Sequence, residues 1–378
     1  MSNLNRRQWL QKSAFTASLL ALGCRTNFEA AAATKPFQNG LIHTTSPLPL
    51  HWNENPFGPS QKAVQAVAEV MAKANRYPDD MVAELKGILA NKYAIDNSQV
   101  LLTNGSTEIL GLVGQQIGFD KGELVIPFPS FPTMAMFAGG SGATIKKVPL
   151  TDDKRIDLDQ TLAAISDKTK VVFICNPNNP TSTEVDNAAL KAFCRAVPKN
   201  VLVFVDEAYI EYSQLGAAGS MIPLVNELPN LMICRTFSKA YGMAGLRLGY
   251  AISSKAQIDK LKARYVGAEF ATGWPALVAA KATMEDVDFM VNGVQKNQEG
   301  KDIVYRAFDK WGVAYSPSAT NFLYVESKHF VSDVREQLKA KNILITKWPD
   351  MVDHIRISIS EPAHMMEFVE VVEAFLVG

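Results

Sequence analysis

The sequence predicts an α/β protein with a large, mostly parallel mixed sheet, helices on both faces of that sheet, and a smaller α+β domain. Over the central part of the chain, short apolar runs alternate with segments of helical periodicity. Beyond about Glu285 this alternation gives way to a long charged helix and short strands. A chain of 378 residues is also long enough for two domains rather than one.

The central apolar runs are predicted to be buried strands. Parallel strands that are covered on both faces are continuously apolar and partly β-branched, as these runs are. Helices are expected between them, over residues 158–165 and 187–196. The strands are expected at residues 124–127, 171–175, 201–205 and 231–234.

The C-terminal part begins with a helix expected over residues 287–311 and continues with short strands near 322–325 and 343–345. Residues 354–360, HIRISIS, alternate as a half-buried strand does. Ser360 is expected to cap a final helix, with Pro362 in its first turn. A site between two such domains is expected at the carboxyl ends of the parallel strands.

Composition excludes several functional classes. Lysine plus arginine equals aspartate plus glutamate at 38 each, so no broad basic field points to nucleic acid. Outside the N-terminal leader, no segment is apolar enough to span a bilayer. The five histidines show no metal-site spacing, and we expect no metal. Cys175, Cys194 and Cys234 are expected to be small core residues rather than disulfide partners.

The N-terminus resembles a twin-arginine export signal over residues 1–33. Arg6, Arg7 and Lys12 precede a short apolar stretch at residues 14–23, and cleavage would fall in the alanine run at 30–33. The alternatives are an ordinary amphipathic helix, or a lipid anchor on Cys24. The signal implies recognition by the twin-arginine export machinery and a periplasmic location.

The segment 235–250, RTFSKAYGMAGLRLGY, carries the strongest chemical pattern in the chain. It follows a buried strand and places Thr236, Ser238, Lys239 and Arg247 close together. Hydroxyls and a guanidinium suit a phosphate, and a lysine beside them suits the aldehyde of pyridoxal phosphate. Residues 104–110, NGSTEIL, add a glycine turn and a helix start that can point backbone N–H groups at an anion. A plain helix cap is the alternative role for Ser106 and Thr107.

Two further motifs follow predicted strands. Residues 176–181, NPNNPT, read by composition alone as a turn, but their place at a strand end points to a site. In VDEAYIEY, residues 205–212, Asp206 ends a buried strand, where an unpaired carboxylate is costly. A helix cap is the alternative role for Asp206.

From about residue 40 to its end, the chain resembles the class I/II aminotransferases of fold type I, and NENPFGPS at 53–60 is most similar to the histidinol-phosphate aminotransferases. Five motifs occur in the family's order. The resemblance implies a large pyridoxal-phosphate-binding domain over residues 71–284 and a small domain over 285–378. Residues 34–70 are expected to pack on the small domain.

The resemblance also implies residue roles. Lys239 would be the catalytic Schiff-base lysine, Asp206 would pair with the pyridine nitrogen, and Asn179 and Tyr209 would bind the phenolic oxygen. Phe131 would stack on the ring, unless it is only a core aromatic. Tyr77 would reach the cofactor of a neighbouring subunit in a homodimer, unless RYP is a simple turn. The phosphate would be held by Gly105, Ser106, Thr107, Thr236, Ser238 and Arg247.

For the substrate, the resemblance assigns the carboxylate to Arg356 and places Asn55 near the same pocket. A solvated charge on an outer strand face is the alternative for Arg356. The implied reaction is ping-pong transfer of an amino group to a 2-oxo acid such as 2-oxoglutarate. Histidinol-phosphate enzymes carry a further arginine where this chain has Thr346 and Lys347, so an aromatic or other amino acid is a rival donor. A decarboxylase of a phosphorylated amino acid and a non-enzymatic binding module remain alternatives.

Overall fold

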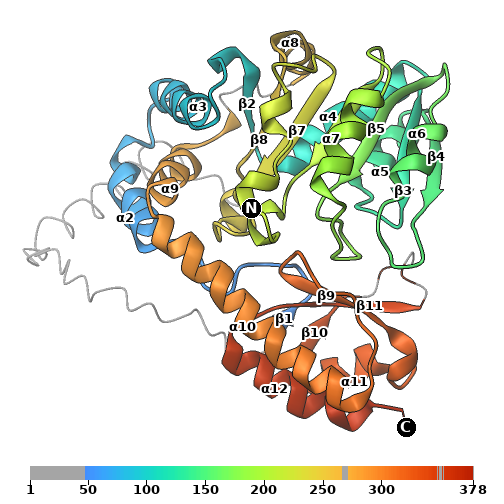
Figure 1. Cartoon of the computed structure of the whole chain (residues 1–378). Coiled ribbons are helices and arrows are strands. Elements are labelled where there is room, and N and C mark those ends of the chain that lie inside the picture. Colours follow the sequence, from blue (N-terminus) through green and yellow to red (C-terminus); the bar gives the residue numbers. More distant parts are fainter. Residues whose placement is uncertain (1–46, 266–270, 347, 349–350, 352, 378) are drawn as a thin grey trace, which may run out of the picture. The chain divides into compact units, whose positions relative to one another are not determined.

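A computed structural model describes residues 47–265, 271–346, 348, 351 and 353–377 (Figure 1). The predicted export signal at 1–33, Cys24 and Lys347 lie outside the described residues. The helices are α2 (Gln61–Val70), α3 (Asp79–Tyr93), α4 (Ser106–Phe119), α5 (Thr133–Gly140), α6 (Leu158–Ala163), α7 (Asn187–Ala196), α8 (Lys255–Lys262), α9 (Trp274–Met284), α10 (Val287–Trp311), α11 (Val334–Ala340) and α12 (Pro362–Val372). The strands are β1 (Leu48–Leu50), β2 (Val100–Thr103), β3 (Glu123–Phe128), β4 (Thr144–Pro149), β5 (Thr169–Cys175), β6 (Leu202–Asp206), β7 (Leu231–Thr236), β8 (Gly249–Ser253), β9 (Phe322–Glu326), β10 (Ile343–Ile345) and β11 (His354–Ser358).

A seven-stranded sheet in the described residues has the order β2-β8-β7-β6-β5-β3-β4. The neighbours from β7 to β4 pair in parallel, whereas β8 pairs antiparallel with both β2 and β7. The sheet is therefore mixed and mostly parallel. The four strands expected from the apolar runs correspond to β3, β5, β6 and β7 at its centre.

Both faces of this sheet are covered, because successive residues of each central strand enter different hydrophobic clusters. On β5, Val172 and Ile174 pack with α3, α7 and α9, whereas Val171, Phe173 and Cys175 pack with α4, α5 and α8. This two-sided burial is the reason the strands are apolar without alternation. The predicted α/β fold class is confirmed.

The C-terminal part has its own hydrophobic cluster. There α10 packs against α12, and β9 pairs antiparallel with β11. Figure 1 shows α10 alongside α12 beneath the small sheets. Val304 and Phe308 of α10 pack against Ile355 and Ile357 of β11. Cys175, Cys194 and Cys234 are buried and free, as expected for core residues.

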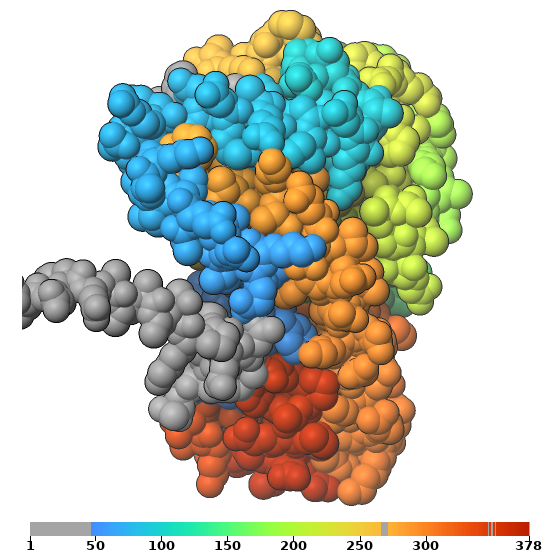
Figure 2. All heavy atoms as spheres, turned by 90° about the vertical axis from the view of Figure 1, so that its left-hand side faces the viewer, coloured from blue at the N-terminus to red at the C-terminus, as the bar shows by residue number. Residues whose placement is uncertain are grey.

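The segment after residue 47 contacts two regions. β1 pairs in parallel with β10, and Leu50 belongs to the C-terminal cluster. α2 instead packs against α9 and contributes Ala63 to a cluster of the large sheet. In Figure 2 the blue atoms of this segment lie beside the orange atoms of α9 and α10 and the red C-terminal atoms. The predicted domain boundaries stay a prediction.

Ser360 does not cap the final helix, so that prediction was wrong. Glu361 occupies the N-cap position without a side-chain cap, and Pro362 is the first helical residue. The Ser360 hydroxyl instead lies 3.1 Å from His364 Nδ1, within the first turn. None of the described helices is both long and apolar enough to cross a bilayer.

Candidate active site

A cavity of about 400 Å³ opens where the segments that follow β2, β3, β5, β6 and β7 meet residues 52–54 and the strand β11. This is the carboxyl edge of the parallel strands, where ligands bind in open α/β sheets. The predicted site residues that line it are Ser106, Thr107, Phe131, Asn179, Asp206, Tyr209, Thr236, Ser238, Lys239, Arg247 and Arg356.

Lys239 is half-buried in this cavity, three residues after the end of β7. Its Nζ donates to the backbone oxygens of Trp52, at 3.0 Å, and Asn53, at 3.1 Å. Burial, reinforced by the positive charge of Arg356, lowers the pKa of Lys239 to about 7. The amine can therefore gain or lose a proton near neutral pH.

Asp206, at the end of β6, is 2% exposed and lines the same cavity. Its Oδ1 accepts a hydrogen bond from Ala208 N at 3.1 Å. Burial raises the pKa of this carboxyl to about 7, and the charge of Glu207 adds to the effect. A cation brought into the cavity beside Asp206 would favour its ionised form.

The helix α4 begins at the cavity, with Gly105 at its N-cap position. Gly105 has a φ of +84°, and a Cβ placed there would lie 2.3 Å from Arg247 Nη2. Only glycine lets the guanidinium come this close to the turn. Ser106 and Thr107 are the first helical residues and the N-cap makes no side-chain hydrogen bond, so the N-terminus of α4 together with Arg247 is suited to hold an anion.

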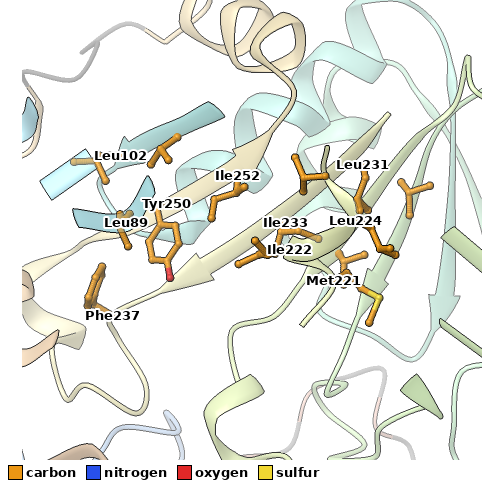
Figure 3. Packing of buried hydrophobic residues seen from close by; sticks show 14 of the residues in the cluster. Leu89, Leu102, Met221, Ile222, Leu224, Leu231, Ile233, Phe237, Tyr250 and Ile252 are labelled. Atoms are coloured by element: carbon orange, nitrogen blue, oxygen red, sulfur yellow. The ribbon is translucent and has the colours of Figure 1, made fainter. Parts of the chain in front are cut away.

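The packing of Phe237 orients Thr236 and Ser238, the two hydroxyl residues that precede Lys239. This ring is buried and packs against Tyr241 and Tyr250, with centroid distances of 5.1 and 5.7 Å. Figure 3 shows Phe237 near the ring of Tyr250. Because Phe237 points into the core, its neighbours Thr236 and Ser238 face the cavity. Ser238 also accepts from Arg247 Nη1 at 3.3 Å.

The turn after β5 brings Asn179 to Arg356, although 177 residues separate them in sequence. Arg356 Nη1 donates to Asn179 Oδ1 at 2.7 Å. Asn179 Nδ2 lies 3.4 Å from the Tyr209 hydroxyl, as two groups that share a ligand oxygen would. Ser182 adopts a left-handed φ of 60° and is fully buried. Its hydroxyl has no hydrogen-bond partner.

Replacing Ser182 by glycine is expected to raise the free energy of unfolding by about 1 kcal/mol. A left-handed backbone costs an L-residue roughly 1–2 kcal/mol, and glycine avoids that cost. Urea denaturation of the full chain measures the change. The matched variant Ser182→Ala removes the unpaired hydroxyl but keeps the strained backbone, and it should gain less. A glycine variant no more stable than the alanine variant would contradict the argument.

Arg356 on β11 is 2% exposed, and in the described part of the chain its hydrogen-bond acceptors are all neutral. Nη2 donates to His51 O at 2.7 Å and to Thr346 Oγ1 at 3.3 Å, while Nε has no partner. Burial lowers its pKa to about 10. A buried cation with neutral partners and a free N–H is suited to an incoming carboxylate or phosphate.

Three predicted residues do not line the cavity: Gly105 forms the turn before α4, and Tyr77 and Asn55 lie outside the cavity. Tyr77 is 80% exposed, before α3. Asn55 is buried, but its Nδ2 donates to Ala240 O at 2.8 Å, so it ties two loops together. The sequence reading missed Asn53, Trp52, Glu54 and Trp348, which do line the cavity. Asn53 lies in the same NENP motif as Asn55, and only the contacts distinguish the two asparagines.

Taken together, the cavity offers an amine of lowered pKa, an anion cup and a buried carboxylate, as a pyridoxal-phosphate enzyme requires. No group of three or more metal-ligating side chains is arranged for a metal ion within the described residues. The chain belongs to the aminotransferase class I and II family, whose sequence profile matches residues 45–372. It is therefore a pyridoxal-phosphate-dependent aminotransferase.

Named relatives agree with the family. The chain is 38% identical to a histidinol-phosphate aminotransferase of Brevibacillus brevis over 301 residues, 80% of this chain and 82% of that protein. It is 33% identical to an aromatic amino acid aminotransferase of Cutibacterium acnes over 342 residues, 90% of this chain and 96% of that protein. Among solved structures, a histidinol-phosphate aminotransferase of Sinorhizobium meliloti in complex with pyridoxal-5'-phosphate has a TM-score of 0.77 and 27% identity. That match covers 87% of this chain and 92% of that one.

Proposed function

We propose that this chain transfers the amino group of an anionic amine to a 2-oxo acid, as a histidinol-phosphate-type aminotransferase does. The observation that carries this proposal is that Lys239 lines one cavity with Asp206 and Arg356, whose charges act on its amine. When bound, pyridoxal phosphate supplies an aldehyde for the amino group and an electron-poor ring that stabilises negative charge on the substrate carbon.

The residues of the chain then have separate tasks. Thr236, Ser238, Arg247 and the N-terminus of α4 bind the phosphate. Asp206 would pair its charge with the ring nitrogen and favour the protonated form of that nitrogen, and this pairing would offset the desolvation of the carboxylate. With the cofactor bound, Lys239 would take the proton from the substrate's α-carbon and return it to the carbon that the cofactor's aldehyde contributes, because its pKa near 7 allows both steps at neutral pH.

Arg356 orients the substrate by its anionic group. Its buried guanidinium donates hydrogen bonds to three neutral acceptors. Two of its coplanar N–H groups can instead donate to a carboxylate or phosphate of the substrate. Orientation fixes which bond at the substrate carbon lies in reach of Lys239.

Replacing Arg356 by lysine is expected to raise the KM for the 2-oxo acid by about 10²-fold, with a smaller change in kcat. Lysine keeps the charge but loses the fork that a carboxylate needs, and one charge-assisted hydrogen bond is worth about 1.5–3 kcal/mol. Steady-state kinetics at saturating donor measures it. Arg195→Lys is the matched control, since Arg195 makes a two-point pair with Glu227 on the surface. An unchanged KM would exclude Arg356 from substrate binding.

The identity of the donor depends on the outer wall of the cavity. Thr346 pairs with Arg356 across the strands and donates to His51 O at 2.5 Å, in the place where the resemblance expects an arginine. Trp348 lies over the Arg356 guanidinium, with its ring centroid 4.6 Å away, and 6.4 Å from the ring of Phe131. This aromatic wall favours an aromatic amino acid as the second candidate donor.

The donors are compared directly at fixed 2-oxoglutarate. Histidinol phosphate with the higher kcat/KM supports the first assignment, whereas phenylalanine or tyrosine with the higher value supports the second. Release of carbon dioxide without an amino-acid product would overturn both. Lys347, the other cation of this region, lies outside the described residues.

We also propose a homodimer in which Tyr77 reaches the neighbouring subunit's cofactor. The support is the exposure of this ring, at 80%, just before α3. Sedimentation of Tyr77→Phe should still give a dimer, with weaker cofactor binding. A monomeric wild-type chain that binds the cofactor fully would refute the shared site.

Export through the twin-arginine pathway to the periplasm is proposed from Arg6 and Arg7. A reporter fused after residue 33 should lose export when both arginines become lysines. Continued export of that variant would refute the pathway. Exported reporter found only in membrane fractions would favour a lipid anchor on Cys24.

A further inference from the structure

Residues 51–54, the strap, run between the two cations that would act on the substrate. The carbonyl oxygen of His51 accepts from Arg356, and those of Trp52 and Asn53 accept from Lys239 Nζ. Three consecutive carbonyls of one short segment thus hold both cations. Lys239 and the strap lie 186 residues apart in sequence, so the contact exists only in the folded chain.

Asn53 determines the shape of the strap. It is 1% exposed and has a left-handed φ of 54°, which asparagine tolerates better than most residues do. Its N donates to Ser358 Oγ at 2.9 Å, and the same hydroxyl donates to Asn53 Oδ1 at 2.8 Å. Its Nδ2 donates to the Tyr209 hydroxyl at 3.1 Å, and Asn321 Nδ2 donates to its backbone oxygen at 3.0 Å. The side chain and both backbone groups are therefore fixed by three separate parts of the chain.

The residues that directly follow the strap are tied to the loop that carries Lys239. Asn55 donates to Ala240 O, and a Cβ on Gly242 would lie 1.9 Å from Gly58 O. Only glycine, here at a φ of +68°, permits this backbone approach. The carbonyls of Trp52 and Asn53 thus keep a fixed place relative to the lysine.

We propose that Asn53 is a positioning residue. It holds the backbone carbonyls of Trp52 and Asn53 as hydrogen-bond acceptors for the Lys239 amine while this amine is not bonded to the cofactor. The inference rests on the proposed function, because only a turning-over aminotransferase releases that amine. Carbonyl oxygens accept from the protonated amine without adding a charge to the cavity. They leave Arg356 free of a carboxylate that would compete with substrate.

The charges around Lys239 make such acceptors necessary. Arg356 from β11 and Arg247 beyond the lysine loop disfavour its protonated form, while Glu54 of the strap and Asp206 of β6 favour it. The net result, dominated by burial, is the lowered pKa described above. The Tyr209 ring, with its centroid 5.7 Å from Nζ, is a further neighbour. Two carbonyl acceptors oppose the fall in pKa by bonding to the charged form.

The test uses the full-length chain after removal of the cofactor. Acetic anhydride labels neutral amines, and mass spectrometry of the Lys239 peptide gives the pH midpoint of labelling. Asn53→Gly keeps the left-handed backbone accessible but deletes the side-chain hydrogen bonds with Tyr209 and Ser358. We expect its midpoint to fall by about one pH unit, the size of one lost hydrogen bond to a charged group. Ser358→Ala should shift the midpoint in the same direction.

Asn230→Ala is the matched control. Asn230 is a buried asparagine that also binds backbone oxygens, at Val201 and Pro198, away from the cavity. The Asn230→Ala variant should be less stable than the wild type, and its pH midpoint of Lys239 labelling should be unchanged. An unchanged or higher midpoint in Asn53→Gly, or an equal shift in Asn230→Ala, would overturn the inference. If Lys239→Ala is inactive while Asn53→Gly titrates like the wild type, the proposed function stands and only the role of Asn53 fails.

Discussion

Replacing Lys239 by alanine is expected to lower kcat by at least about 10³-fold and to abolish covalent retention of the cofactor. A positioned proton-transfer group contributes about 10²–10⁴ to the rate, and the proposed function also assigns this lysine the bond to the cofactor. Among the described residues, Lys239 is the lysine that lines the cavity, and its pKa of about 7 suits the proton transfer. Single-turnover kinetics and the absorbance of the purified protein measure both losses.

Two comparisons make this result specific. Lys281→Ala removes a surface lysine that is paired with Glu84 at 2.6 Å, and it should keep full activity. A small primary amine added to Lys239→Ala should restore part of the rate, because the cavity left by the side chain admits it. Substantial turnover of Lys239→Ala without added amine would remove this lysine from the mechanism.

Replacing Asp206 by asparagine is expected to lower kcat by about 10²-fold or more while stabilising the cofactor-free chain at pH 7. The rate falls because a preorganised charge at the ring is lost, and such groups are worth about 10²–10³. Stability rises because the buried carboxylate has a pKa of about 7 and little compensation before the cofactor binds. Kinetics and urea unfolding of the same variant should therefore move in opposite directions.

The stability of the cofactor-free chain depends on pH because folding raises the pKa of Asp206. An unfolded aspartate titrates near 3.9, and the folded Asp206 near 7. Between these values the folded chain holds the proton more tightly than the unfolded chain, so its contribution to stability is complete below about pH 4 and lost as pH rises to about 7. The asparagine variant should lack this decline in the cofactor-free protein.

Glu207 is the matched control, because it is the adjacent carboxylate with a full set of partners. It accepts from Arg235 Nε, Ser220 Oγ and Met221 N at 2.8, 2.8 and 2.7 Å. Glu207→Gln breaks a buried ion pair and should destabilise the chain by about 3–5 kcal/mol. If Asp206→Asn destabilises to a similar extent, Asp206 has a structural partner and its assigned role is wrong.

Local patterns account for what could be predicted. The strands β5, β6 and β7 read as apolar runs because both of their faces are covered, and α10 was predicted with its observed bounds from its periodicity. Asp206, Asn179 and Lys239 could be selected because Asp206 is the last residue of such a strand and the other two lie in the short turns that follow one. A costly or reactive side chain placed at the carboxyl edge of a parallel sheet is visible in one short stretch of sequence.

Other features depend on contacts that no short stretch contains. The cap expected at Ser360 fails because its hydroxyl lies against His364 instead. Asn55 and Asn53 are equivalent by composition, yet Asn55 ties a loop and Asn53 meets Ser358, 305 residues away. The antiparallel β8 was missed, although it pairs with both β2 and β7.

The sequence by itself determined the fold class, the central strands and the order of the chemical groups along the chain, since periodicity and residue type are local properties. The tertiary structure decided which of these groups meet. Arg356 gained Asn179 and His51 as partners, Lys239 gained two carbonyls of the strap, and burial moved the pKa values of Lys239 and Asp206 toward neutrality. Desolvation and pairing depend on chain segments that are distant in sequence, so they arise only when the chain is folded.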